Sequence, residues 1–186
     1  MKRFILLAGF VMLMTRLSWA DVGFVQQVID GTTFKLLSGE TVKMIGVDFP
    51  KTGDAALDEQ HSKDIAGFIR GFISGNLVEL EYDVKQKDPD GNLLAYVWFE
   101  YPSELDLKTM PVKGNYEVTY LKDNEGEGHF LVFLNATMIK SGFAKPSFES
   151  PNIRHAELFE KIYKEQQSNT EAQLANARVD IQMSGQ

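Results

Sequence analysis

The chain has 186 residues, of which 44% are hydrophobic, enough for one domain with a sizeable core. It contains no cysteine, which excludes thiol nucleophiles, thiolate metal sites and disulfides. Its 19 basic and 26 acidic side chains give a net charge of −7, and no dense run of Lys or Arg is present, which weighs against avid binding of a polyanion.

Residues 1–20 are typical of a secretory signal peptide. Lys2 and Arg3 precede an apolar run over 4–14, and Ser18-Trp19-Ala20 is a small-x-small cleavage site. The apolar run is shorter than the roughly 20 residues that span a bilayer. An uncleaved amphipathic anchor is the alternative interpretation. We therefore predict a secreted or periplasmic protein, cleaved after Ala20, with no spanning segment in residues 21–186 and a mature net charge of −10.

Residues 25–50, VQQVIDGTTFKLLSGETVKMIGVDFP, predict three short strands joined by two tight turns. Asp30-Gly31 and Ser38-Gly39 are turn dipeptides that separate apolar runs. Two successive hairpins are therefore expected at the start of the domain.

The next segments predict one helix and two further strands. Apolar residues recur at helical spacing within 57–74, at Ile65, Phe68, Ile69, Phe72 and Ile73. Gly67 and Gly71 lie one turn apart on this helix. They either allow a close approach to the sheet or are merely tolerated. Residues 77–82 predict a strand, 85–92 a loop, and 93–101 the fifth strand.

Residues 102–130 predict an insertion that contains an extra hairpin. Segments 116–121 and 130–134 are its strands, on a polar tether over 103–115. The tip carries Asp123, Glu125 and Glu127, but it lacks the ligand spacing of an EF-hand loop, so a solvated tip is favoured over a calcium site.

The C-terminal part predicts two helices. Asn135 is expected to cap a short helix over 136–141, and the alternative is glycosylation of the Asn135-Ala136-Thr137 acceptor. Residues 152–167 predict a helix that 170–177 extend, followed by a flexible tail over 178–186. One domain over 21–177 is therefore expected.

Three stretches closely resemble the staphylococcal-nuclease (thermonuclease) family. They are VIDG with TTFKL and ETVKMIGVDFPKT in residues 28–52, GNLLAY over 91–96, and residues 135–145. The resemblance covers most of residues 21–186. It implies an α+β fold, a five-stranded OB-type β-barrel with about three helices, to which this chain adds the hairpin. It also implies an ancestral activity, calcium-dependent cleavage of phosphodiester bonds in DNA and RNA.

The residues at the family's catalytic positions have mostly changed. The resemblance places the ligating acid after IDG at Thr32 and the acid after the VD-x-P proline at Lys51. The two arginines of the family fall at Lys43 and Asn92, while Asp48 is retained. The metal positions implied are thus Asp48, Thr32 and the backbone carbonyl of Phe49. The ligand-binding positions implied are Asp30, Thr32, Lys43 and Asn92.

These substitutions change the charge of the site. Asp48, Lys43 and Lys51 sum to +1, against −1 for the family's three acids and two arginines. A lysine lacks the planar fork of an arginine, and one lost transition-state contact costs about 10²–10³ in rate. The sequence therefore predicts a degenerate member that binds a small anion, an oligonucleotide or a protein without cofactor.

The alternative is an active calcium-dependent phosphodiesterase. It requires Asp54, Asp58 or Glu59 to replace the missing base, or Lys85 or Lys87 to replace the arginine at position 92. A third hypothesis is that a protein partner binds the insertion over 102–134. The histidines at 61, 129 and 155 show no spacing of a shared metal site or of a catalytic triad.

Overall fold

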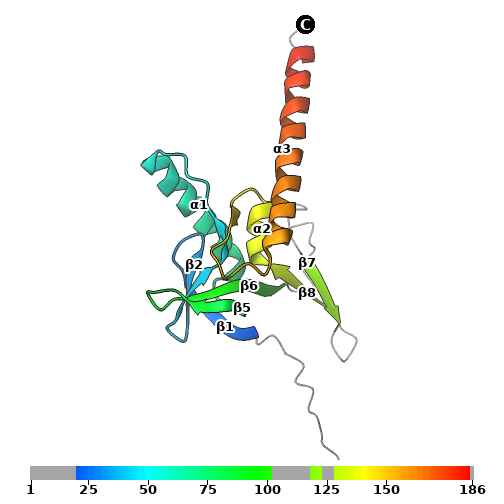
Figure 1. Cartoon of the computed structure of the whole chain (residues 1–186). Helices are drawn as coiled ribbons and strands as arrows, with labels where there is room; N and C mark the ends of the chain where they lie inside the picture. Colours follow the sequence, from blue (N-terminus) through cyan, green and yellow to red (C-terminus); the bar gives the residue numbers. More distant parts are fainter. Residues whose placement is uncertain (1–19, 102–117, 123–127, 185–186) are drawn as a thin grey trace, which may run out of the picture.

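The structure is a computed structural model that describes residues 20–101, 118–122 and 128–184 (Figure 1). Its elements in chain order are β1 (Ala20–Val28), β2 (Thr33–Leu36), β3 (Thr41–Met44), β4 (Gly46–Asp48), α1 (Ala55–Ile73), β5 (Leu77–Lys87), β6 (Leu93–Tyr101), β7 (Val118–Lys122), β8 (Gly128–Phe133), α2 (Leu134–Lys140), β9 (Lys145–Ser147) and α3 (Ala156–Ser184).

Five strands close into a barrel in the order β3-β2-β1-β5-β6. Neighbours along this order pair antiparallel, and β3 then pairs parallel with β6, with Val42 opposite Leu93. Inward-facing side chains fill the interior, among them Val25, Phe34 and Leu80. The predicted OB-type α+β fold is therefore confirmed, including both hairpins of the N-terminal meander.

Strands β7 and β8 form the expected extra hairpin. Strand β8 pairs with β6, so the hairpin extends the sheet beyond the barrel, with Phe133 opposite Trp98. The tether over 103–115 and the acidic tip at Asp123, Glu125 and Glu127 lie outside the described residues.

Helix α1 begins two residues earlier than the sequence predicts, because Asp54 caps it. The Asp54 carboxylate accepts hydrogen bonds from the backbone N–H groups of Ala56 and Leu57. Gly67 and Gly71 are exposed, and a Cβ atom at either position would meet nothing within 4 Å. These glycines are therefore tolerated and do not mediate close packing.

Asn135 does not cap α2, contrary to the prediction. The helix starts at Leu134, and Asn135 lies inside it with a side chain that is 0% exposed. The Asn135 amide donates to the Ile45 carbonyl at 2.8 Å and accepts from the Val97 N–H at 2.9 Å. Burial excludes Asn135 as a glycosylation acceptor in the fold. Its role is to connect β6 to the segment after β3.

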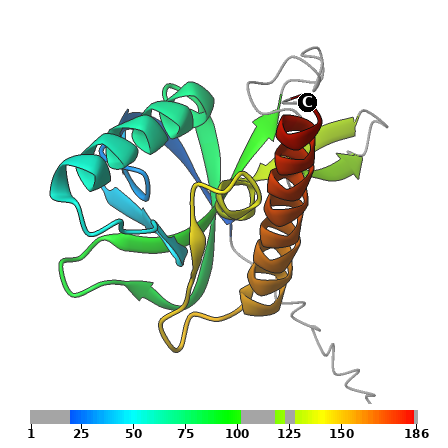
Figure 2. The same ribbon diagram turned by 90° about the horizontal axis from the view of Figure 1, so that it is seen from above.

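Helix α3 is longer than predicted and extends away from the barrel (Figure 1). Within residues 156–178 of this helix, burial is confined to the first turns, through Phe159 and Ile162, and the helix packs against α2 and β9. Seen from above, α1 and α3 flank α2 (Figure 2). The helix continues through residues 178–184, where the sequence predicts a flexible tail. Among the described helices, none has the length and apolarity that crossing a membrane demands.

Candidate functional site

A pocket of about 390 Å³ lies where the family resemblance places the catalytic residues. It is bounded by β3, β4, the β5–β6 turn and the segment that follows β9. Its polar lining residues are Thr32, Lys43, Asp48, Lys85, Asp88, Asp90, Ser147, Glu149, Ser150 and Asn152.

Non-local strand pairing assembles this pocket. Thr32 occupies the turn between β1 and β2, and β3 carries Lys43. Strand β4 pairs antiparallel with β9, which sets Gly46 opposite Ser147 and brings the segment with Glu149 to the rim. The pocket thus joins residues more than 100 positions apart along the chain.

The predicted site residues Asp30 and Thr32 are hydrogen-bonded to each other. The Asp30 carboxylate accepts the Thr32 N–H at 2.7 Å and the Thr32 hydroxyl at 3.2 Å. Thr32 lines the pocket, whereas Asp30 shapes the turn from outside the lining. The Asp30 carboxylate therefore serves the local turn.

Asp48 lines the pocket, whereas the side chain of Phe49 turns away from it. One carboxylate oxygen of Asp48 accepts the Phe49 N–H at 2.9 Å. The Phe49 ring packs against the core, beside Gly31 and Ile65. This packing fixes the turn that carries Asp48.

Asn92, where the resemblance implies an arginine, is not among the lining residues. Its side-chain amide donates to the Asp88 carboxylate at 2.9 Å, and its backbone N–H donates to the other oxygen of Asp88. The hydrogen bond from the Asn92 side chain is the main cause that lowers the pKa of Asp88, and the charge of Lys43 adds to it against burial. Asn92 therefore organises the β5–β6 turn.

Lys51 and the three acids considered as substitutes also lie outside the lining. Lys51 is exposed. Asp54 caps α1, and Asp58 accepts the N–H and hydroxyl groups of Thr52, both at 2.7 Å. Glu59 pairs with Lys63 one turn along α1. None of these side chains supplies a base to the pocket.

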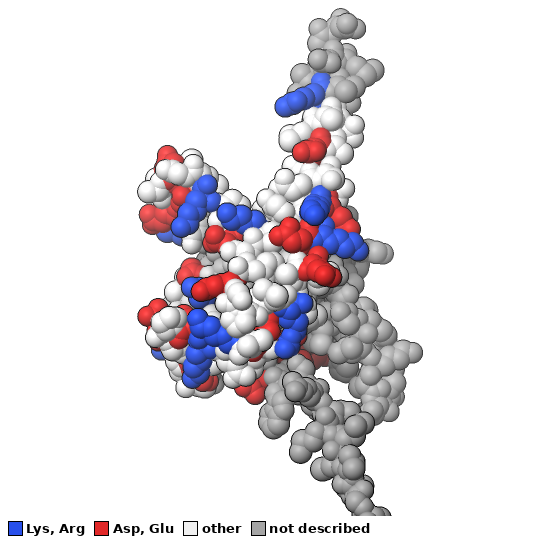
Figure 3. All heavy atoms as spheres, in the orientation of Figure 1, with Lys and Arg blue, Asp and Glu red and all other residues white. Residues whose placement is uncertain are grey.

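The charge of the pocket differs from the +1 counted at the family positions. Four carboxylates, of Asp48, Asp88, Asp90 and Glu149, face two ammonium groups, of Lys43 and Lys85, for a net charge of −2. Basic and acidic side chains alternate over the face shown in Figure 3, without a continuous basic surface. The expectation of a cationic pocket is therefore wrong, because the residues after β9 and in the β5–β6 turn add acids.

The donor set does not fit a calcium ion. Calcium takes six to eight oxygens, usually with several carboxylates among them. Across residues 20–101, 118–122 and 128–184, no three His, Asp or Glu side chains come close enough together to hold a metal. One oxygen of Asp48 and both oxygens of Asp88 already accept hydrogen bonds within their own loops.

Sequence reasoning missed most of the acids that line the pocket. Asp88 and Asp90 flank Pro89 in a predicted turn. Their position just before β6 is the sequence feature that could have placed them at the site. No sequence pattern near Glu149 or Asn152 indicates that they belong to the site. The pairing of β4 with β9 brings Glu149 there, and the hydrogen bond from the Lys85 N–H to the Asn152 side chain holds Asn152 there. Lys85, a candidate replacement for the missing arginine, does line the pocket.

Comparison with known proteins gives two significant similarities, although no family model matches the chain. The chain is 31% identical over 147 residues to a thermonuclease of Staphylococcus intermedius, covering 77% of this chain and 70% of the relative. It is 29% identical over 145 residues to a thermonuclease of Staphylococcus hyicus, covering 76% and 68% respectively.

Proposed function

The chain belongs to the thermonuclease family, and we propose that it is a catalytically degenerate member that binds a ligand at the pocket without cleaving phosphodiester bonds. The observation that supports this most is the pocket's polar lining, which contains no guanidinium group among the described residues. Phosphoryl transfer depends on charge stabilisation of the transferring group, for which bidentate guanidinium groups are suited.

The ligand that best matches the pocket is a protein segment that carries both charges. A polyanion would face four carboxylates and only two ammonium groups. Lys43 and Lys85 supply contacts for acidic groups, and Asp90 and Glu149 are exposed and available to basic ones. An oligonucleotide and a small anion are the other ligand classes, and the binding test below separates them.

The first test is cleavage. The purified protein is incubated with single-stranded DNA and RNA at neutral and alkaline pH, with calcium and separately with a chelator. We expect no calcium-dependent cleavage. Calcium-dependent nicking that Asp48→Ala abolishes would establish the alternative, an active phosphodiesterase, since Asp48 is the one family acid that is retained.

The second test is binding. Fluorescence anisotropy with a labelled single-stranded DNA is measured at two salt concentrations, beside a titration with inorganic phosphate followed by NMR. We expect a Kd for DNA weaker than about 10⁻⁴ M at physiological salt, the weak end of non-specific binding. Tighter binding that Lys43→Gln and Lys85→Gln both weaken would assign the site to an oligonucleotide, and saturable phosphate binding would assign it to a small anion.

We also propose that the protein is exported, on the basis of the basic, apolar and small-x-small pattern in residues 1–20. N-terminal sequencing of the protein from an expressing bacterial cell tests this. Asp21 is the expected first residue of the mature chain. A retained Met1 would favour the uncleaved anchor.

A further inference from the structure

The outer face of β1 is apolar where the solvated face of a sheet is normally polar. Antiparallel sheets that face water on one side alternate apolar residues inward with polar residues outward. In β1, Val25 is buried, but the outward residues Val22 and Phe24 are 62% and 42% exposed. Leu37, in the turn after β2, and Leu77, at the start of β5, are 64% and 60% exposed. We call the four exposed side chains, of Val22, Phe24, Leu37 and Leu77, the β1 patch.

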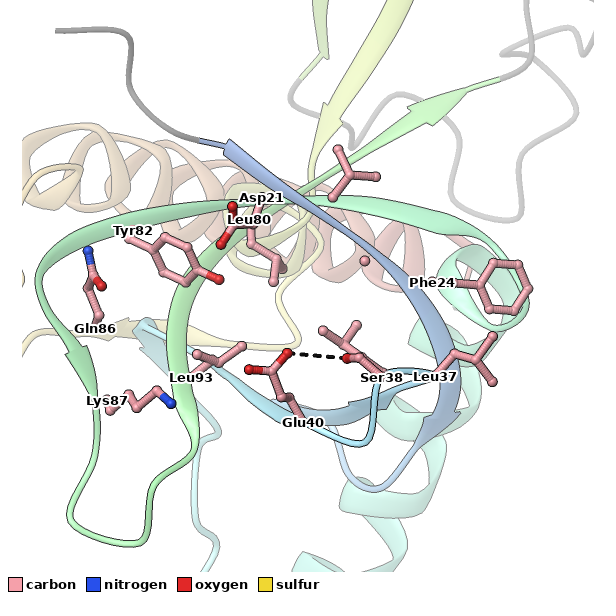
Figure 4. Close-up of a pocket in the computed structure, with 13 residues that line it drawn as sticks. Asp21, Phe24, Leu37, Ser38, Glu40, Leu80, Tyr82, Gln86, Lys87 and Leu93 are labelled. Carbon is pink, nitrogen blue, oxygen red and sulfur yellow. Dashed lines mark hydrogen bonds between the residues drawn. The ribbon is translucent and has the colours of Figure 1, made fainter.

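Strand pairing makes the β1 patch contiguous. Phe24 lies opposite Leu77 in the antiparallel pair of β1 and β5. The Leu37 N–H donates to the Phe24 carbonyl at 2.8 Å, which places Leu37 on the other flank of Phe24. Val22 precedes Phe24 by two residues and therefore shares its face of the sheet. Figure 4, a close-up of a second pocket of the barrel, shows the Phe24 side chain on the outer side of β1, whereas Tyr82 points toward that pocket.

Two opposite charges lie at diagonal corners of the β1 patch. Lys35, on β2, lies opposite Gln27 of β1, and Glu79, on β5, lies opposite Val22. Both side chains are partly exposed, and neither forms an ion pair in the described part of the chain. Two strand spacings and about four residues along the strands separate them, roughly 16 Å, too far for contact within one chain.

This diagonal arrangement is complementary to itself under two-fold symmetry. Consider a two-fold axis in the plane of the patch that passes through Phe24, perpendicular to the diagonal from Lys35 to Glu79. Rotation about it sets Phe24 of one copy against Phe24 of the other, and Lys35 of each copy against Glu79 of the other. It also sets Leu37 of each copy against Val22 of the other. Such an isologous contact is the commonest arrangement in oligomers, and the strands of the two copies would cross steeply, as in orthogonal sheet packing.

We propose that the β1 patch is the interface of a homodimer, with Phe24 at its centre and a Lys35–Glu79 ion pair at each end. An apolar centre with a charged rim is the usual anatomy of a protein interface, and contiguous exposed apolar surface is typical of interaction sites. Cleavage after Ala20 would leave an ammonium group beside the Asp21 carboxylate, and these two charges sum to zero at the edge of the patch. This inference does not depend on the proposed function of the first pocket.

The test measures the monomer–dimer equilibrium of the purified protein by sedimentation velocity. Four apolar side chains per copy place the interface in the small, transient class, so we expect a Kd on the order of 10⁻⁵ M, and the concentrations should bracket this value. Leu37→Glu should weaken the dimer at least about tenfold, because it sets an unpaired charge against Val22. Leu57→Glu makes the same change at an exposed position of α1 and should leave the Kd unchanged.

Exchanging the two charges tests the symmetry. Lys35→Glu sets like charges opposite each other at both ends of the interface and should weaken the dimer about tenfold. Lys35→Glu/Glu79→Lys exchanges the charges and should restore the Kd of the unaltered chain. Circular dichroism verifies that each variant folds, and if Leu37→Glu does not fold, the charge exchange decides.

Three results would overturn the proposal. They are a chain that stays monomeric over the whole concentration range, association that Leu37→Glu leaves intact, and a charge exchange that does not restore the dimer. Binding of a monomeric chain to phospholipid vesicles would also overturn it and would assign the β1 patch to a lipid surface.

Discussion

The side-chain amide of Asn152 forms two hydrogen bonds with the backbone of Lys85, 67 residues earlier in the chain. The amide donates to the Lys85 carbonyl at 2.7 Å and accepts the Lys85 N–H at 2.8 Å. Asn152 thereby pairs with β5 as a neighbouring strand would, and both residues line the first pocket. The segment that closes the pocket is thus attached to the hairpin that forms its opposite wall.

Removing this amide should destabilise the fold. Asn152→Ala leaves two backbone groups of Lys85 without their partner, and we expect the free energy of unfolding to fall by about 2 kcal/mol. Urea denaturation followed by circular dichroism measures the change. Asn176→Ala, at an exposed position of α3, is the control and should change stability by less than about 0.5 kcal/mol. Equal effects of the two substitutions would contradict this role.

Two glycine substitutions should act in opposite directions. Gly46 has a φ of +79°, and a Cβ atom there would lie 2.8 Å from the Phe159 ring, so Gly46→Ala combines backbone strain with a clash. We expect the free energy of unfolding of this variant to fall by about 2–4 kcal/mol.

Gly67 lies on the exposed face of α1 with open space around it, so Gly67→Ala should raise the free energy of unfolding by about 0.5–1 kcal/mol. Thermal melts of both variants test this, and destabilisation by Gly67→Ala would restore the close-packing interpretation.

Glu81 should make the fold sensitive to acid. Burial opposes its charge, but hydrogen bonds from His155, Arg154 and Trp98 outweigh burial and lower its pKa from 4.5 to about 2. The ionised carboxylate therefore contributes stability at pH values above 4.5, and this contribution, about 3 kcal/mol at most, is lost as the pH falls from 4.5 to 2.

The measurement is the free energy of unfolding between pH 7 and pH 2. Glu81→Gln should lower stability at pH 7 and flatten the decline below pH 4.5. Glu79→Gln, two residues earlier on β5, removes the same charge away from His155, Arg154 and Trp98. Its free energy of unfolding should decline below pH 4.5 as steeply as that of the unaltered chain. An unchanged pH profile for Glu81→Gln would show that the carboxylate does not contribute.

Restoring two acids should restore a response to calcium. Thr32→Asp/Lys51→Glu returns the two acids that the family resemblance implies, one on the pocket lining and one on the exposed segment that follows Asp48. At 100 times its Kd, calcium should then raise the free energy of unfolding by about 2.7 kcal/mol, whereas the unaltered chain should show no gain. Thermal melts with calcium and with a chelator measure this. Ser168→Asp/Lys164→Glu makes the same charge change on α3 and should not respond. Stabilisation of the unaltered chain by calcium would contradict our account of the first pocket.

Local patterns predicted the barrel well. Asp30-Gly31 and Ser38-Gly39 marked both turns of the meander, and the apolar run over 93–101 matched β6. Strand β5 continues to Lys87, beyond the predicted end, because it forms a hairpin whose outer residues are solvated and therefore polar. Polar sequence of this kind is common to loops and solvated hairpins, so composition alone did not separate them.

The site was predicted less well, because its assembly depends on distant contacts. Of the positions that the resemblance names, Thr32, Lys43 and Asp48 line the pocket, whereas Asp30, Phe49, Lys51 and Asn92 do not. Asn135 matched a capping position by sequence, but the helix begins before it and its amide bonds Ile45 and Val97 instead. The sequence near Asn135 does not indicate either of these hydrogen bonds, because their partners lie far away along the chain.

The parallel pairing of β3 with β6 has a consequence for biosynthesis. A ribosome has made about half of the chain before the partner of Val42 appears at Leu93. Until then the nascent sheet has two open edges, which are templates for pairing with other chains. Translation pausing before residue 93, or truncation there, should therefore favour aggregation, and a chaperone that shields strand edges would be needed most in that interval.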